Sequence, residues 1–138
     1  MQIKRSATAH WEGSGKEGNG SVTTASGVLN DTQYSFNTRF ADGIGTNPEE
    51  LIGAAHAGCF SMKLAFVLQG QNFTATSIDT KATVILEDGA INVIDLHVRA
   101  AVPGITEEQF LAAATEAKND CPISQLFKAT INLDAALV

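Results

Sequence analysis

The stretch from residue 47 to residue 69 most constrains how this chain can fold, because it is long, apolar and rich in small residues. It predicts a helix: Asn47 can cap the first turn, Pro48 suits the first helical position, and Glu50 follows the cap by three residues. We expect the helix to end near Gly70, since glycine is a common C-cap. Apolar side chains recur at helical spacing and predict one buried face: Leu51, Ile52, Ala55, Cys59, Met62 and Phe66.

Two glycines, Gly53 and Gly58, lie inside this predicted helix among alanine and serine residues. Each costs about 1 kcal/mol of helix stability relative to alanine. A helix that contains both is expected to bring another element very close to its backbone. Two interpretations of Cys59 stay open here. It is either an inert thiol in a tightly packed core helix, or a reactive thiol at a close contact between elements.

The rest of the chain predicts six strands and one further helix, in the order βββ-α-ββ-α-β. Because hairpins connect most strands, we expect an α+β fold with largely antiparallel sheets around the long central helix. Asp88-Gly89 fits a type I′ hairpin turn. The apolar phase slips near Val93 and Ile94, which predicts either a β-bulge or a change of the covered face. The predicted strands cover residues 7–11, 21–26, 34–40, 80–87, 90–101 and 129–135, and the second helix covers 106–119.

Length and composition narrow the class of protein. The 138 residues suit one domain over residues 1–138. A formal net charge of −6 disfavours binding to nucleic acid or to anionic membranes. Lys63 and Gln69 interrupt the longest apolar run, so we expect no membrane span, and residues 1–5 lack the apolar core of a signal peptide. We therefore expect a cytoplasmic protein.

The two cysteines, Cys59 and Cys121, are the candidate reactive groups. A thiol in the middle of a helix gains little from the helix dipole, so Cys59 needs a cation to ionise it. Three candidates stay open: Lys63 one turn on, His56 one turn back, and Arg39 on the polar face of the predicted third strand.

Cys121 follows Asp120 and precedes Pro122, and the neighbouring carboxylate makes it a poor first nucleophile. A metal site would have to combine His56, Cys59 and Cys121, with His10 or His97 as a further ligand. A structural zinc site usually has a pair of closely spaced ligands on each side, and the Cys121 side has none. We expect neither a metal nor a cofactor.

These residues resemble the OsmC/Ohr family of thiol peroxidases, and specifically its osmotically inducible OsmC branch. The similarity extends over nearly the whole chain, and its most specific parts are the central helix and the Cys-Pro pair. The matching segments are Ala9-His10-Trp11-Glu12-Gly13, Ser26-Gly27-Val28-Leu29, Phe36-Asn37-Thr38-Arg39-Phe40, residues 45–57, Cys59-Phe60-Ser61-Met62 and Cys121-Pro122.

The resemblance implies an intertwined homodimer that reduces organic hydroperoxides under stress, with a dithiol as reductant. It implies that Cys59 attacks the peroxide and that Cys121 resolves the sulfenic acid as an intramolecular disulfide. The arginine of the family corresponds to Arg39, which would stabilise the thiolate and the departing alkoxide. Its glutamate corresponds to Glu49, which would hold the guanidinium through a bidentate pair.

The spacing of Glu49 and Cys59 adds one expectation. Ten helical residues correspond to about 15 Å along a helix axis, too far for both to share a small site within one chain. We therefore expect Arg39 and Glu49 of one subunit to complete the site around Cys59 of the other. Two alternatives to the peroxidase stay open: a thiol redox sensor, and a non-catalytic dimer that binds a small apolar ligand.

Overall fold

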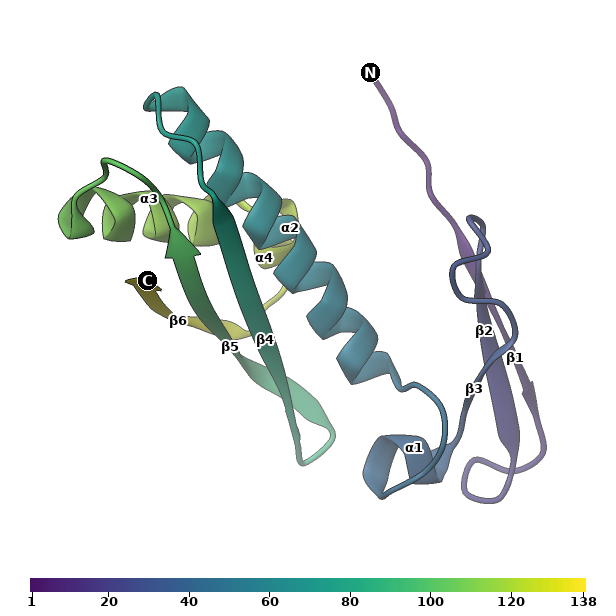
Figure 1. Cartoon of the computed structure of the whole chain (residues 1–138). Helices are drawn as coiled ribbons and strands as arrows, with labels where there is room; N and C mark the ends of the chain where they lie inside the picture. The colour runs from purple at the N-terminus through teal and green to yellow at the C-terminus, as the bar shows by residue number, and fades with distance from the viewer. The chain divides into compact units, whose positions relative to one another are not determined.

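The computed structural model describes residues 1–138 as two compact units, Met1–Leu51 and Ile52–Val138. The first unit contains an antiparallel sheet of β1 (Ala7–Glu12), β2 (Asn19–Thr24) and β3 (Thr32–Tyr34), with β2 in the middle (Figure 1). A short helix, α1 (Phe36–Phe40), follows β3. The predicted arrangement of three antiparallel strands is thus confirmed, although the third strand is Thr32–Tyr34 and not residues 34–40. The single domain over the whole chain stays a prediction.

The predicted third strand is wrong beyond Tyr34, because the next residues form α1. A capping box starts this helix: the Ser35 hydroxyl oxygen accepts from the Thr38 N–H at 3.3 Å, and the Thr38 hydroxyl oxygen accepts from the Ser35 N–H at 2.8 Å. Phe36 and Phe40, four residues apart, stack with ring centroids 4.8 Å apart. The aromatic residues that suggested a strand therefore lie one turn apart on a helix, and Arg39 lies on this helix and not on a strand.

The long helix α2 (Pro48–Gly70) confirms the predicted boundaries. The Glu50 N–H donates to the Asn47 side-chain oxygen at 2.8 Å, as the predicted cap requires. The predicted buried face is wrong, since Met62 and Phe66 are 65% and 63% exposed. The helix is apolar nearly all round, so periodicity alone did not select the face. The residues of α2 that are buried are Gly53, His56, Phe60, Leu64 and Leu68.

The two glycines of α2 differ in their surroundings. A Cβ added at Gly53 would lie 3.2 Å from the carbonyl oxygen of Ala82, so the helix approaches the backbone of a strand there. Gly58 has no such neighbour within 4 Å. The expected close approach is therefore confirmed at Gly53.

By length and composition, α2 could cross a membrane, so the expectation that no apolar run is long enough is wrong. In this structure, however, α2 is the core helix of the second unit.

The second unit has a three-stranded sheet of β4 (Ser77–Glu87), β5 (Ala90–Ala101) and β6 (Thr130–Leu137), with β5 in the middle. The β4–β5 hairpin is antiparallel, and its turn has positive φ at both Asp88 (φ 51) and Gly89 (φ 77), which fits the predicted type I′ turn. The register shifts between Ile85 and Leu86, which confirms the predicted bulge. β6 runs parallel to β5, so this sheet is mixed.

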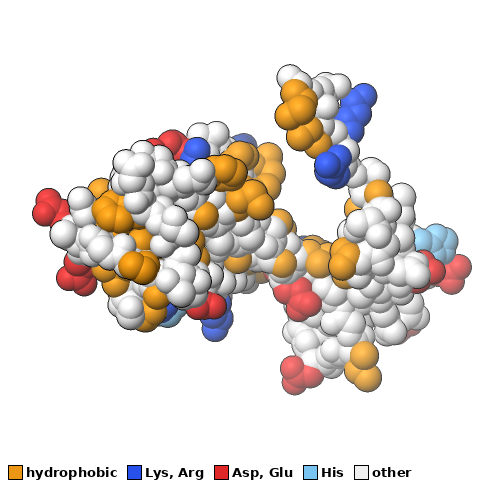
Figure 2. All heavy atoms as spheres, turned by 45° about the horizontal axis from the view of Figure 1, so that its top comes forward, with side chains coloured by type: hydrophobic (Ala, Val, Ile, Leu, Met, Phe, Trp, Pro, Cys, Tyr) orange, Lys and Arg blue, Asp and Glu red, His pale blue; other side chains and the backbone are white.

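Two helices connect β5 to β6 and complete the core. Thr106 and Gln109 form the predicted capping box at the start of α3 (Glu107–Asp120), and α4 (Pro122–Leu126) follows after Cys121. Side chains from α2, β5 and α3 form one buried cluster: Phe60, Leu64, Leu68, Leu96, Val98, Ala100, Val102, Phe110, Ala113, Ala114, Ala117 and Cys121. Other hydrophobic side chains remain at the surface of the molecule (Figure 2).

Candidate functional site

The second unit brings the two cysteines together. Cys59 lies in the middle of α2, Cys121 lies between α3 and α4, and their sulfur atoms are 2.8 Å apart. Both are free thiols; Cys59 is half-buried and Cys121 is fully buried. A disulfide bond is about 2.05 Å long, so the two sulfurs need only a small further approach to bond.

The Cys-Pro sequence explains why Cys121 reaches this position. Proline disfavours the helical conformation of the residue before it, and Cys121 has φ −60° and ψ 123°, which ends α3. The Cys121 N–H still donates to the carbonyl oxygen of Ala117 at 3.0 Å. Pro122 then starts α4, so the chain turns sharply at Cys121 while its side chain stays in the core.

The surroundings of Cys59 act on its ionisation in both directions. Burial raises the pKa of the Cys59 thiol, and the contact with Cys121 raises it further. The backbone N–H of Ile123 donates to the Cys59 sulfur, and this bond and the charge of Lys63 lower the pKa, but the net shift is upward. Within the second unit, Cys59 is therefore mainly a thiol at neutral pH.

Ile123 is a site residue that the sequence analysis missed. It lies in the first turn of α4, where backbone N–H groups have no partner inside the helix. A proline followed by a one-turn helix is a weak sequence signal for such a free N–H, and only the tertiary structure shows which sulfur it meets.

His56 does not serve as a cation for Cys59. It is fully buried, and burial lowers the pKa of its imidazole, which keeps the ring neutral at neutral pH. Its Nε2 atom forms a hydrogen bond of 2.7 Å with the Ser124 hydroxyl. Of the candidate cations considered for Cys59, Lys63 contributes within the second unit, and His56 is excluded.

Arg39 and Glu49 form an ion pair within the first unit. Both Nε, at 2.9 Å, and Nη2, at 2.7 Å, contact the same carboxylate oxygen, Oε1. The expected bidentate pair with both oxygens is therefore wrong in detail, because Oε2 is buried without a partner. The Glu49 side chain is 12% exposed and that of Arg39 is 39% exposed.

Local hydrogen bonds fix this ion pair. The Asn47 side-chain amide donates to the carbonyl oxygen of Thr38 at 3.0 Å, which ties α1 to the start of α2. The Thr46 N–H donates to the carbonyl oxygen of Gln33 at 2.8 Å, which ties the same segment to β3. Arg39 on α1 and Glu49 in the first turn of α2 are thus held on two connected elements.

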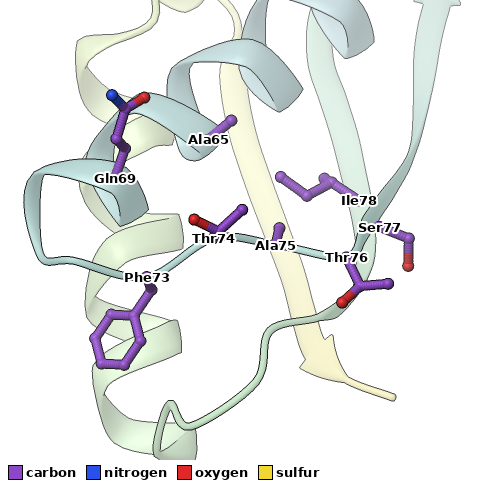
Figure 3. Close-up of a pocket in the computed structure, with 8 residues that line it drawn as sticks. All are labelled: Ala65, Gln69, Phe73, Thr74, Ala75, Thr76, Ser77 and Ile78. Atoms are coloured by element: carbon purple, nitrogen blue, oxygen red, sulfur yellow. The ribbon is translucent and has the colours of Figure 1, made fainter.

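Other features of the surface offer no reactive groups of this kind. No group of three or more His, Cys, Asp or Glu side chains converges where a metal ion could bind. A pocket of about 330 Å³ lies between the C-terminal part of α2 and residues 73–78 (Figure 3). Its lining includes Gln69, Phe73 and Thr74 but no cysteine and no charged side chain. The thiol pair and the ion pair are therefore the candidate functional groups.

The chain thus combines an α+β fold with a thiol of the central helix that meets the thiol of a Cys-Pro pair. The family model described as OsmC-like protein matches residues 41–136. The chain belongs to this family.

Individual relatives agree with this assignment. The chain is 52% identical to Peroxiredoxin OsmC of Escherichia coli K12 over 141 residues, which cover 99% of both chains. Its fold matches the organic hydroperoxide resistance protein OhrB of Bacillus subtilis with a TM-score of 0.68 and 25% identity, over 99% of this chain and 98% of that one. An OsmC-like protein from Mycoplasma pneumoniae matches with a TM-score of 0.79 and 14% identity, over 100% and 99% of the two chains. The predicted α+β fold around a long central helix is confirmed.

Proposed function

We propose that this protein is a thiol peroxidase that reduces organic hydroperoxides, with Cys59 as the peroxidatic and Cys121 as the resolving cysteine. The observation that carries this proposal is the 2.8 Å separation of the two sulfurs. The names of the relatives support it, since one is a peroxiredoxin and another an organic hydroperoxide resistance protein. No cofactor is needed, because the sulfur atoms themselves exchange the electrons.

The first step oxidises Cys59. Its thiolate attacks one peroxide oxygen, so that an S–O bond forms, the O–O bond breaks, and the alkoxide leaves and takes a proton to become the alcohol. Cys59 is then a sulfenic acid. Cys121 is close to one side of the sulfur, so the peroxide must reach Cys59 through the part of its surface that is still exposed.

The second step resolves the sulfenic acid. The Cys121 sulfur attacks the Cys59 sulfur, an S–S bond forms, and the hydroxyl group leaves as water with the proton of the Cys121 thiol. A dithiol then reduces the disulfide by exchange and restores both thiols. Such reductants operate in the cytoplasm, where we place this protein.

The raised pKa of Cys59 means that the second unit alone is a poor activator of its own thiol. We infer that Arg39 and Glu49 of a second subunit supply the missing positive charge. Arg39 uses Nε and Nη2 for Glu49, which leaves Nη1 for the thiolate and the departing alkoxide. The ten residues between Glu49 and Cys59 along α2 correspond to about 15 Å, which favours a site shared between subunits.

A homodimer would also cover the exposed apolar face of α2. Met62 and Phe66 lie one turn apart on this face, and neighbouring exposed apolar side chains that form a patch often mark an interaction site. A second copy of the chain is the occupant that the site requires, since it brings Arg39 and Glu49 as well. We therefore propose an intertwined homodimer with two equivalent sites.

Consumption of an organic hydroperoxide with a dithiol over many turnovers tests the activity. We expect turnover in the wild type, none with Cys59→Ser, and little with Cys121→Ser, which cannot form the intramolecular disulfide. A redox sensor would oxidise once and then show little turnover. A ligand-binding protein would consume no peroxide, and its Cys59→Ser variant would bind the ligand unchanged.

A mixed dimer of Cys59→Ser and Arg39→Ala chains tests the shared site. If Arg39 acts on the sulfur of the other subunit, one intact site forms in each mixed dimer and activity rises above that of both parent variants. If Arg39 acts within its own chain, each subunit lacks one essential group. Activity no higher than that of the parents would contradict the shared site and leave the peroxidase itself intact.

A further inference from the structure

A buried hydrogen bond between His56 and Ser124 lies beside the thiol pair and has no role in the chemistry described above. The imidazole Nε2 and the serine hydroxyl are 2.7 Å apart, and both side chains are buried. The other ring nitrogen, Nδ1, is buried without a partner. A buried polar side chain that leaves one of its groups unpaired costs stability, so this pair calls for an explanation.

The positions of His56 and Ser124 suggest an explanation for their hydrogen bond. His56 precedes Cys59 by three residues on α2, and Ser124 follows Cys121 by three residues on α4. Three residues make nearly one helical turn. The hydrogen bond therefore joins the same two segments as the sulfur contact and lies about one turn away from it on each.

The bond at Ser124 is the buried side-chain hydrogen bond of α4. This helix has five residues, its N-terminus has no side-chain cap, and Ser124 is its buried residue. The segment nevertheless carries two groups that act on Cys59: the Cys121 thiol before it and the Ile123 N–H within it. The hydrogen bond at Ser124 thus acts together with the packing of Ile123 against the core and the 3.4 Å bond from the Gln125 amide to the Asn119 carbonyl oxygen to restrain both. The edge of the Phe127 ring, with its centroid 5.5 Å from that of His56, packs against the same imidazole.

Building on the proposed function, we propose that His56 and Ser124 are positioning residues that hold the resolving thiol of Cys121 against Cys59. The bond keeps α4 in place while Cys59 is a thiol or a sulfenic acid, which raises the effective concentration of Cys121 at the Cys59 sulfur. The disulfide joins the same two segments, so the hydrogen bond forms at least as readily in the disulfide form, and each of the two bonds stabilises the other.

Loss of this restraint has a chemical consequence. A Cys59 sulfenic acid that waits longer for Cys121 meets a second hydroperoxide molecule more often. The second hydroperoxide transfers one oxygen to the Cys59 sulfur, its O–O bond breaks, and it leaves as an alcohol. Cys59 is then a sulfinic acid, and the enzyme is inactivated. His56 and Ser124 therefore protect the protein against its own substrate.

Two measurements on Ser124→Ala and His56→Leu test this proposal. The first is the equilibrium between dithiol and disulfide in buffers of reduced and oxidised dithiothreitol, which involves no peroxide. The second is the fraction of Cys59 found as sulfinic acid after treatment with excess organic hydroperoxide, measured by mass spectrometry. Ser61→Ala is the matched control, since it removes another side-chain hydrogen bond of α2, the 2.6 Å contact with Thr80 on β4.

We expect Ser124→Ala and His56→Leu each to lower the disulfide equilibrium constant about fivefold, the effect of one hydrogen bond. The sulfinic fraction should rise by a similar factor, and Ser124→Thr, which keeps the hydroxyl, should restore both values. The Ser61→Ala control should stay within twofold of the wild type.

Wild-type values of both quantities in Ser124→Ala, with unchanged far-UV circular dichroism, would overturn the proposal. An equal change in Ser61→Ala would also overturn it, because the effect would then reflect general stability. If the wild type forms no sulfenic acid with hydroperoxide, the proposed function fails, while the dithiothreitol equilibrium still decides the role of the hydrogen bond.

Discussion

Truncation of Phe66 on the exposed face of α2 should dissociate the proposed homodimer. Phe66 is 63% exposed in the single chain. A phenylalanine side chain of roughly 200 Å² then leaves about 125 Å² for a partner to cover. At about 25 cal/mol per Å², this burial contributes about 3 kcal/mol for each subunit.

A symmetric dimer contains the contact twice, so the upper limit for Phe66→Ala is about 6 kcal/mol. This corresponds to a change in Kd of roughly 10⁴-fold. Alanine retains part of the buried area, so we expect a Kd increase of at least about a hundredfold. Because the proposed site is shared between subunits, peroxidase activity should fall with dissociation and recover at high protein concentration.

Sedimentation velocity over a range of concentrations measures this Kd, and the peroxidase assay follows the same dilution series. Leu111→Ala is the matched control, because Leu111 is an exposed apolar side chain, 43% exposed, on α3. Equal dissociation constants for Phe66→Ala and Leu111→Ala would refute the assignment of α2 as the dimer face. Full specific activity of a monomeric Phe66→Ala protein would refute the shared site.

Three further predictions follow from the charges and the buried imidazole. Arg39→Lys keeps the charge but loses the two N–H groups that converge on Glu49, so kcat/KM should fall at least about tenfold while the fold, measured by circular dichroism, stays intact. Lys63→Gln removes a charge that lowers the pKa of Cys59, so the pKa rises further and alkylation of Cys59 by iodoacetamide at pH 7.5, followed by mass spectrometry, should slow; equal rates would exclude Lys63 as an activator. Burial lowers the pKa of His56 in the folded state, so the unfolded chain binds more protons below about pH 6.5. The free energy of unfolding in urea should therefore fall as the pH drops from 7 towards 5, and this fall should be smaller in His56→Leu.

The boundaries of α2 were predictable from its sequence because they depend on local chemistry. Asn47, Pro48 and Glu50 specify the start through a cap, and Gly70 marks the end. The buried face was not predictable from spacing. Both sides of the helix are apolar, and only contact with the sheet decides that Phe60 is covered while Phe66 is exposed.

Two other differences between the predictions from the sequence and the structure have similar physical causes. The Phe36 and Phe40 pair fits a strand as well as a helix, and the capping box at Ser35 and Thr38 decides for the helix. At the candidate site, the sequence offered Cys59 and Cys121 as candidates, and the resemblance to a known family indicated their roles. The Ile123 N–H at the Cys59 sulfur and the Ser124 hydroxyl at His56 depend on tertiary structure, which no local pattern specifies.

The topology of the second unit makes its earlier residues depend on segments that are synthesised later. Cys59 leaves the ribosome 62 residues before Cys121, and β6, which pairs with β5, is the last strand of the chain. Contacts between residues so distant in sequence slow folding. A nascent chain therefore carries a Cys59 thiol without its Cys121 partner until the Cys121 segment has been synthesised and β6 has paired with β5.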